Sequence, residues 1–432
     1  MKLLIFTPAC NTSAIGRMVR IIVNVLKEQG HTIGIVRSED LSLLDSSMHD
    51  YGCEVMRWDE LEKVDAATRA ADMIVYQIGD NYHYHRGCLE WMPLVPGIVC
   101  LHDFFLGNLF WAWADGRCKI AEEILKSLYG PNIAAAYFRF GSPTEFVEST
   151  RQTAPMTEWI AAQATGVITH SGWDAQRVLE SCPGPVEVVP LPYRGSHDAI
   201  GGQTHPTPRF AEFQVLTFGH INPNKRAESV IRALGISQSL RHKSSYHLVG
   251  VIAPDVSARL RGLAASLKVP LRISGEVNEA TLMQAIDEAD VVCCLRLPAL
   301  EAASASTIEA MLYAKPVVVM DVGFYQSLPD DCVKKINPKS EVLELQRTLE
   351  VLYESPQERR AMGRRAAQWA AATFDPVSYA DRLVAMGQET ARLNPALQAT
   401  RGFTSTLARW GAPDHFPLDD TLDPLKIFEL RI

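Results

Sequence analysis

Short apolar segments alternate with longer amphipathic segments along most of the chain. The segment 16–29 carries Val19, Ile22, Val23 and Leu26 at helical spacing, so it is expected to be an amphipathic helix. Near-continuous apolar strands separated by such helices are typical of a parallel sheet that is covered on both faces. In the first half of the chain, strands are expected at residues 2–6, 30–36, 73–77, 97–101, 166–169 and 186–189.

The same alternation starts again in the second half. Between residues 194 and 212 the periodicity is lost and Gly, Pro, Ser and His gather, which is typical of a linker. After it, strands are expected at 215–218, 246–249, 271–274, 291–295 and 316–320, and helices at 225–234, 256–267, 279–289 and 306–313.

A chain of 432 residues is longer than one hydrophobic core usually sustains. We therefore predict an α/β fold with two doubly wound, Rossmann-like domains that face each other across a cleft. The N-terminal domain is expected at 1–193, the linker at 194–212 and the C-terminal domain at 213–375. Residues 376–432 are expected to form a C-terminal helix and tail that pack back on the N-terminal domain.

Composition narrows the class of protein. The net charge of -8 leaves no basic surface of the kind that binds nucleic acid, so a nucleic-acid partner is not expected. The apolar segment at the N-terminus is too short for a signal peptide, and no segment is expected to span a membrane. The nine cysteines are scattered without a C-x-x-C pair, which favours reduced thiols. The sequence thus predicts a soluble, cytoplasmic protein.

Two cations stand where a helix is expected to begin. The strand at 215–218 runs into GHINPNKRAESVIRAL, so that Lys225 and Arg226 open the next helix. Cations are unfavourable at the positive end of a helix dipole unless an anion binds there. Because ligands of such sheets bind at the carboxyl ends of strands, we expect Lys225 to contact a phosphate and Arg226 to point to solvent. The alternative is that both are solvated cations on an exposed turn.

A second helix start follows the strand at 291–295, in the segment LEAASASTIEAMLYAKPVVV. Ser304, Ala305 and Ser306 are expected to begin this helix, so that their backbone N–H groups and the two hydroxyls meet a phosphate. Their small side chains let the anion approach the backbone closely. The sequence therefore predicts a phosphate site at this helix start.

Two glutamates flank the same run of small residues. Glu309 lies about one turn along the helix and is expected to hold a ribose diol, each carboxylate oxygen accepting from one hydroxyl. Glu301 precedes the helix and is expected to hold hydroxyls on the other side of the phosphate. The alternative is that Ser306 and Glu309 form only a capping box.

The N-terminal domain offers His102 and Gly16 as candidates. His102 lies at the carboxyl end of an expected strand, and Gly16 lies near a helix start, where a glycine lets a ligand approach closely. His83 and His85 have no evident third ligand, so they are not expected to bind a metal. No Asp-x-Asp occurs in the chain, which argues against the usual metal site for a nucleotide-sugar diphosphate.

Several blocks are similar to the retaining GT-B glycosyltransferases of family 4. Glu301-x7-Glu309 followed by AMLYAKPVVVMDVG resembles the E-x7-E and G-x-P-V-V block of that family, and FGHINPNKR resembles its GRLxxxKG, with Lys225 on the lysine. ADMIVYQIGDNYHYH, PGIVCLHD, VITHSGWDAQRV and VVPLPY resemble bacterial surface-polysaccharide members. The resemblance extends from residue 1 to roughly residue 390.

The resemblance implies a retaining, metal-independent hexosyltransferase without a cofactor. Its donor is a nucleotide-diphosphate sugar (a GDP- or UDP-sugar) bound mainly by the C-terminal domain. Its acceptor is a saccharide or a lipid-linked saccharide bound mainly by the N-terminal domain, in polysaccharide or glycoconjugate synthesis. Peripheral contact with the inner face of the membrane is left open.

The resemblance also assigns residues to roles. Lys225 contacts the diphosphate, Glu309 the ribose, Glu301 the donor sugar, and His102 the sugar across the cleft. The catalytic residues it implies are His102, Lys225 and Glu301. The donor-binding residues it implies are Gly16, Gly219, His220, Lys225, Ser304, Ala305, Ser306 and Glu309.

The chain departs from the family pattern at three places. His220 stands where the family usually has arginine, Ser13-Ala14 replaces a Gly-Gly pair, and Ala302-Ala303 replaces a bulkier pair. Two other functions are therefore kept as alternatives. One is a non-catalytic GT-B module that binds a nucleotide sugar or a partner protein, and the other is a nucleotide-sugar epimerase or hydrolase.

Overall fold

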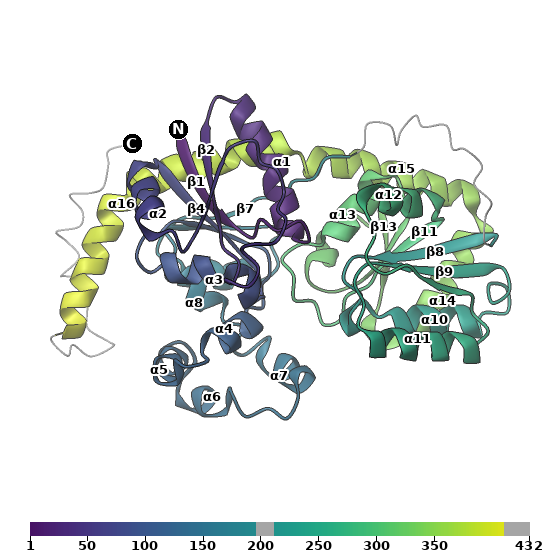
Figure 1. The fold of residues 1–432 in the computed structure, drawn as a ribbon. Coiled ribbons are helices and arrows are strands. Elements are labelled where there is room, and N and C mark those ends of the chain that lie inside the picture. The colour runs from purple at the N-terminus through teal and green to yellow at the C-terminus, as the bar shows by residue number, and fades with distance from the viewer. Residues whose placement is uncertain (196–210, 410–432) are drawn as a thin grey trace.

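The computed structural model describes residues 1–195 and 211–409 and shows two parallel sheets, each covered by helices (Figure 1). The first sheet has the strand order β3-β2-β1-β4-β5-β6-β7, and all its neighbouring pairs are parallel. Its strands are β1 (Lys2–Thr7), β2 (Thr32–Arg37), β3 (Glu54–Arg57), β4 (Met73–Ile78), β5 (Ile98–Leu101), β6 (Gly166–Thr169) and β7 (Val186–Val188).

The second sheet has the order β10-β9-β8-β11-β12-β13, again with parallel neighbours. Its strands are β8 (Phe213–Phe218), β9 (Ser244–Val249), β10 (Leu271–Ile273), β11 (Val291–Cys294), β12 (Val317–Met320) and β13 (Val333–Ile336). The central strands β8, β11 and β12 are buried along their whole length. Two doubly wound α/β domains are thereby confirmed.

Most helices connect successive strands. In the first domain they are α1 (Ala14–Glu28), α2 (Leu61–Ala70), α3 (Tyr82–Trp91), α8 (Thr157–Ala161) and α9 (Ala175–Ser181). In the second they are α10 (Ala227–Ile236), α11 (Pro254–Ser266), α12 (Glu279–Glu288) and α13 (Ala305–Leu312). Helix α14 (Glu341–Glu354) follows the last strand, and short 3-10 turns lie at Pro223–Lys225, Gly323–Ser327 and Pro338–Ser340.

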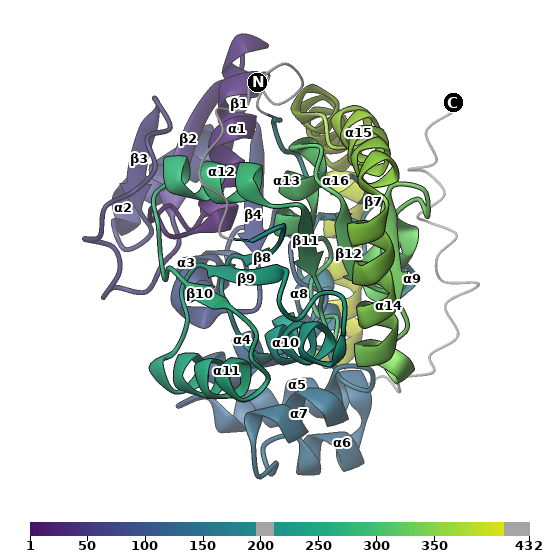
Figure 2. The ribbon, with the colours of Figure 1, turned by 90° about the vertical axis from the view of Figure 1, so that its right-hand side faces the viewer.

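A group of four helices between β5 and β6 projects from the first domain (Figure 1). The group consists of α4 (Gly107–Trp113), α5 (Cys118–Tyr129), α6 (Pro131–Ala136) and α7 (Pro143–Thr150). It lies next to α10 and α11 of the second domain, where Thr144 lines a pocket together with residues of those helices (Figure 2).

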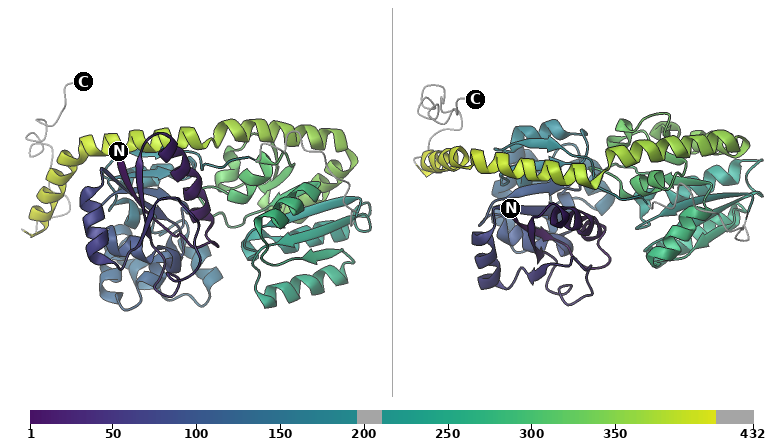
Figure 3. Two further views of the ribbon diagram at one scale, coloured as in Figure 1. Left: turned by 45° about the horizontal axis from the view of Figure 1, so that its top comes forward. Right: turned by 90° about the horizontal axis from the view of Figure 1, so that it is seen from above.

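The last two helices run along one side of both domains (Figure 3). Helix α15 (Pro356–Thr373) packs on α13, and α16 (Pro376–Arg409) packs on α1 and β6. The hydroxyl of Tyr379 in α16 donates to the Cys100 sulfur at 3.3 Å. Residues 196–210 of the expected linker and 410–432 of the expected tail lie outside the described residues.

The boundaries of most expected elements shift by one or two residues. The strand expected at 30–36 is Thr32–Arg37, and the helix expected at 256–267 is Pro254–Ser266. Strands β3 and β13 were not predicted. Both are short and lie at the edge of a sheet, and both carry charged residues, which are common on edge strands but weaken the apolar pattern.

The packing of α15 on α13 gives a test of the fold. A Cβ on Gly363 of α15 would lie 2.0 Å from the Ala314 carbonyl oxygen, whereas a Cβ on Gly262 of α11 would meet nothing within 4 Å. We expect Gly363→Ala to lower the free energy of unfolding by about 1–3 kcal/mol through overpacking. Gly262→Ala should raise it by about 0.5–1 kcal/mol, because alanine favours the helix. Urea unfolding of both variants measures this, and equal effects would contradict the packing.

Candidate active site

The carboxyl ends of β5 and β11 meet through a short antiparallel contact between the two domains. Asp103 pairs with Glu301, the Ala302 N–H donates to the His102 carbonyl at 2.9 Å, and the Phe104 N–H donates to the Leu300 carbonyl at 2.8 Å. This contact holds the segment after β5 against the segment after β11. It therefore brings His102 and Glu301, predicted from opposite halves of the sequence, to one place.

The Lys225 side chain is buried behind the end of β8. It is 3% exposed, and its ammonium donates to the Phe218 carbonyl. Gly219 has a φ of 91°, and a Cβ there would lie 2.9 Å from Lys225 Nζ, so the glycine both allows the turn and leaves room for the lysine. The reading of Lys225 as an exposed, solvated cation is therefore wrong.

The helix after β8 begins later than predicted. Lys225 ends a 3-10 turn, Arg226 is the N-cap with a φ of 54°, and α10 starts at Ala227 with Glu228 in its first turn. Arg226 does not point to solvent alone, because its guanidinium pairs with Glu341 at 2.6 Å. The two cations thus turn to opposite sides of the loop, and only Lys225 lies at the end of β8.

Positive charge is concentrated at this end of the second sheet. Burial, together with the nearby Arg296, lowers the pKa of Lys225 to about 7, although Glu301 and Glu309 act in the opposite direction. The pKa of His220 is also lowered, by partial burial and by repulsion from Lys225 and Arg296. Like charges held this close favour binding of an anion.

Ser304 to Ser306 begin a helix as predicted, since α13 starts at Ala305 with Ser304 as N-cap. The hydroxyls of Ser304, Ser306 and Thr307 bond to one another at 3.1–3.4 Å. Ser304 makes no side-chain capping bond, and Ser306 lies inside the helix, so the alternative of a Ser306–Glu309 capping box is wrong. The first N–H groups of α13 therefore have no side-chain cap.

Glu309 forms an ion pair across the domain boundary. Arg17 of α1 lies 2.7 Å from its carboxylate, and the Arg17 guanidinium also lies over the Tyr193 ring. Burial raises the pKa of Glu309, and Arg17 partly opposes this. The carboxylate predicted to hold ribose is therefore partly buried and is held by the N-terminal domain.

Glu301 forms a comparable pair with Arg296, at 3.0 Å. Arg296 follows the last residue of β11 by two positions and was not among the predicted site residues. A cation just beyond a buried strand is the same signal that pointed to Lys225, so the sequence did contain a pointer to it. With Ser304 and Tyr325, these two residues line a cavity of about 10 Å³.

His102 is buried and neutral. Its Nε2 lies 2.6 Å from the Gln77 side-chain oxygen, which can only accept, so Nε2 carries the proton and Nδ1 is left as an acceptor. Burial lowers the pKa of His102 well below its usual value, and the neighbouring His170, whose ring centroid lies 4.8 Å away, adds to this. Burial and the adjacent Glu301 raise the pKa of Asp103 to about 7.

Gly16 has a packing reason that needs no ligand. A Cβ there would lie 2.4 Å from the Pro8 carbonyl oxygen and 3.1 Å from the Tyr51 hydroxyl. Its N–H is capped by Ser13 at 3.0 Å. Close packing of α1 on the loop after β1 thus accounts for this glycine, and its contact with a ligand stays a prediction.

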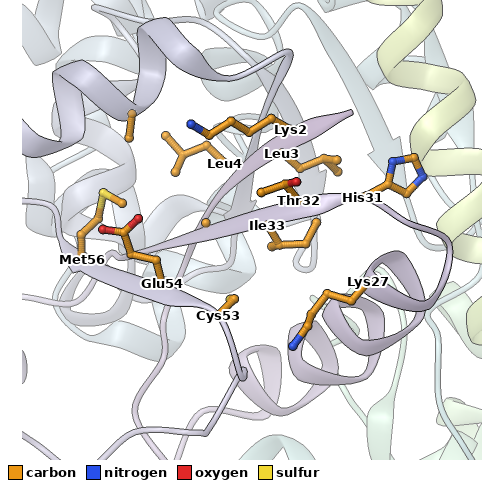
Figure 4. Close-up of a pocket in the computed structure, with 12 residues that line it drawn as sticks. Lys2, Leu3, Leu4, Lys27, His31, Thr32, Ile33, Cys53, Glu54 and Met56 are labelled. Carbon is orange, nitrogen blue, oxygen red and sulfur yellow. The ribbon is translucent and has the colours of Figure 1, made fainter.

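Two larger pockets lie elsewhere. One of about 400 Å³ is at the amino ends of β1 to β3, where Figure 4 shows the side chains spread over both faces of the strands. The other, of about 470 Å³, lies on the Arg226 side of the loop after β8.

Within residues 1–195 and 211–409, no group of three or more His, Cys, Asp or Glu is placed to hold a metal ion. No helix in this part of the chain is long and apolar enough to cross a membrane.

Comparison with known proteins agrees with the fold. Residues 208–369, which contain the second sheet, match the family model Glycosyl transferases group 1. No curated protein sequence matches the chain. Three solved structures illustrate the structural similarity.

Sucrose-phosphate synthase from Thermosynechococcus elongatus is 15% identical, with a TM-score of 0.61, over 93% of this chain and 100% of its own. HepE from Anabaena, in complex with UDP, is 17% identical, with a TM-score of 0.60, and the match covers 89% of this chain and 98% of HepE. A glycosyltransferase from Rickettsia africae is 13% identical, with a TM-score of 0.60, and the match covers 90% of this chain and 98% of that glycosyltransferase.

The fold is therefore GT-B, as predicted. Together with the family match over the second domain, it supports a glycosyltransferase that uses a nucleotide sugar.

Burial of Lys225 gives a prediction on stability. Because its pKa is about 7 in the folded chain and 10.5 in the reference state, the unfolded chain binds more protons between these values, and stability should rise with pH across that window. Lys225→Met lacks this group. The unfolding free energy of the variant should therefore exceed that of the wild type most at the acid end of the window. This difference should disappear near pH 10.

Denaturant unfolding between pH 6 and pH 10 measures this difference. Lys119→Met, at an exposed position of α5, is the control for loss of one lysine charge. Parallel stability curves for wild type and Lys225→Met would show that the lysine is not buried as described.

Proposed function

We propose that the protein is a retaining, metal-independent glycosyltransferase that moves a hexose from a GDP- or UDP-sugar to a saccharide or lipid-linked acceptor. The observation that carries the proposal is the group of charges at the carboxyl ends of β8 and β11. There the buried Lys225 lies at the end of β8, close to the carboxylates Glu301 and Glu309 and to the start of α13, and the Glu301 segment lies beside His102 of the other domain. The family match over residues 208–369 supports it.

The donor would be bound mainly by the second domain. Lys225, His220 and the N–H groups of α13 would hold the diphosphate, because they supply positive charge and donors at a parallel-sheet edge. Glu309 would accept from the ribose hydroxyls once it exchanges Arg17 for them. HepE has been solved in complex with UDP and with UDP-glucose, which supports a nucleotide-diphosphate sugar as the ligand class.

Catalysis would follow from charge. Negative charge grows on the diphosphate as the glycosidic bond breaks, and Lys225 and the α13 terminus would stabilise it. Because the pKa of Lys225 is about 7, this lysine is partly neutral near pH 7. A bound diphosphate would raise the pKa and keep the lysine in its positively charged form. His102 would contact the donor sugar through its unprotonated Nδ1.

Retention would arise because the acceptor hydroxyl attacks the anomeric carbon from the same face that the diphosphate leaves. The leaving phosphate would help to take the proton of that hydroxyl. Glu301 is paired with Arg296, which suits a hydroxyl-binding group better than a free nucleophile. Mass spectrometry after incubation with donor is expected to find no glycosylated protein. A covalent glycosyl-enzyme would contradict this step.

The acceptor would bind to the N-terminal domain. The reaction would take place in the cytoplasm and would belong to polysaccharide or glycoconjugate synthesis. Contact with the inner face of the membrane would bring a lipid-linked acceptor within reach. The expected domain boundaries, at 193, 212 and 375, are compatible with the positions of the two sheets and of α16.

The function is tested by binding and then by transfer. UDP-, GDP- and dTDP-sugars are screened by thermal unfolding, and one base is expected to raise the melting temperature because ligand binds the folded state. EDTA should leave the shift and the subsequent transfer unchanged. Loss of activity on chelation, restored by Mg²⁺ or Mn²⁺, would contradict metal independence, and absence of any shift would contradict the proposal.

The alternatives give different results in the same assay. An epimerase or hydrolase consumes the donor without acceptor, and a binding module raises the melting temperature without turnover. The departures from the family pattern at His220, Ser13-Ala14 and Ala302-Ala303 are the features that favour a binding module.

Substitution of Glu309 should affect nucleotide binding, whereas substitution of Glu301 should affect turnover. Glu309→Ala is expected to weaken binding of the nucleoside diphosphate about tenfold or more, since a hydrogen bond to a charged group contributes about 1.5–3 kcal/mol. Glu301→Ala should lower kcat without weakening nucleotide binding. Calorimetric titration with UDP and GDP, together with transfer rates, measures both effects.

Arg17→Met is the matched control, because it breaks the Arg17–Glu309 pair but keeps the carboxylate. It should not weaken nucleotide binding. If Arg17→Met and Glu309→Ala lost affinity equally, the ion pair between domains would be the cause, and the ribose assignment of Glu309 would be wrong.

A further inference from the structure

Arg296 is a largely buried cation whose hydrogen-bonding capacity is mostly unused. Its side chain is 14% exposed, and the Glu301 carboxylate, bonded to Nε at 3.0 Å, is its one hydrogen-bond partner among the described residues. A guanidinium has five N–H donors. The remaining donors lie where β11 ends, on the side of the cavity that Ser304 and Tyr325 share.

Arg296 is also close to the other cations of the site. It is among the charges that lower the pKa of both Lys225 and His220, so three basic groups from the loops after β8 and β11 repel one another. Glu301 is the carboxylate that pairs with Arg296, whereas Glu309 pairs with Arg17. Such a cluster is favourable only when a further anion joins it.

The Tyr325 hydroxyl points to the same ligand position. Its side chain is 2% exposed, and its oxygen is buried without a hydrogen-bond partner in the described chain, although Ser304 lies beside it. A buried polar atom left in this way is costly unless a ligand or water completes its bonding. The cavity of about 10 Å³ has room for at most one water, so a phosphate enters only if a side chain of its lining, which includes that of Arg296, moves.

We propose that Arg296 is a third cation of the diphosphate site and that donor binding exchanges its bond to Glu301 for a bidentate bond to the phosphate next to the sugar. The inference rests on the proposed function, because it takes a nucleotide-diphosphate sugar as the ligand. Arginine suits this role, since its planar fork matches two phosphate oxygens. Tyr325 donates to the same phosphate.

The exchange also readies Glu301. Its backbone neighbours Leu300 and Ala302 are bonded to residues 102–104, so Glu301 stays beside His102 when Arg296 turns away. The carboxylate released in this way accepts from a hydroxyl of the donor sugar. Binding of the diphosphate therefore prepares the sugar site, and a nucleoside monophosphate, which lacks the second phosphate, does not.

The first test removes the competing carboxylate. Glu301→Gln frees Arg296 for phosphate, so the affinity for the nucleoside diphosphate should rise severalfold while that for the monophosphate stays unchanged. Calorimetric titration with UDP and UMP, and with GDP and GMP, measures the ratio. The matched control is Glu341→Gln, which breaks the Arg226–Glu341 pair on the other side of the β8 loop and should leave the ratio as in wild type.

The second test removes the cation. Arg296→Met should lower the diphosphate affinity at least tenfold and spare the monophosphate, and Glu301→Gln should have no effect on the ratio in that background. Arg296→Lys should recover part of the loss, because lysine keeps the charge but not the fork. Arg226→Met is the control. If Arg296→Met does not fold, as judged by circular dichroism, the Glu301→Gln result decides alone.

An unchanged diphosphate-to-monophosphate ratio in Glu301→Gln and Arg296→Met would overturn the role of Arg296 and leave the proposed function standing. Failure of wild type to bind UDP or GDP would instead overturn the proposed function, and this inference with it.

Discussion

The antiparallel contact between residues 102–104 and 300–302 is the interaction on which the candidate site depends. Neither sheet alone contains the site, because His102 and the Glu301 carboxylate come from different sheets and meet only where these backbones pair. Backbone hydrogen bonds fix both distance and register, so the two side chains are placed without any contact of their own. The hydrophobic cluster shared by both domains, which includes Val19, Met311 and Leu383, supports this closed arrangement.

Burial of charge is the second constraint. Lys225, Arg296 and Glu309 are all largely removed from water at the carboxyl ends of the second sheet. Lys225 is held by a backbone carbonyl, and Arg296 and Glu309 are each held by one ion pair. Folding thus brings together groups that repel or are desolvated, which costs stability. The cost is understandable if the same groups bind an anion, since binding then relieves repulsion that folding created.

Much of this arrangement follows from local sequence. The apolar strands and the helices between them predicted two parallel sheets, and the rule that ligands bind at strand carboxyl ends pointed to Lys225, Glu301, Ser304 and His102. These inferences needed only the period of the pattern and the ends of the strands. Helices α4 to α7 were not assigned. Of these, α4 and α6 are only 7 and 6 residues long, which is too short to show a clear period.

What could not be predicted depends on contacts between distant parts of the chain. The pairs Arg17–Glu309 and Arg226–Glu341 join residues far apart in sequence, and no periodic pattern links them. The conformation of Arg226, with φ at 54°, is one that arginine seldom adopts, so the delayed start of α10 has no local signal. The packing of Gly16 against the Pro8 carbonyl could not be predicted either, because only the folded loop brings that carbonyl near.

The ion pairs of the two glutamates differ in what they connect. Arg296 and Glu301 lie on one loop, so their exchange is local to the second domain, whereas Arg17 and Glu309 join the domains. A ligand that takes Glu309 therefore removes a bond from the domain interface, while one that takes Arg296 does not. Because a ligand shifts a conformational equilibrium only by its difference in affinity for the two states, the nucleoside end of the donor, and not its phosphates, is the part expected to change how the domains are held together.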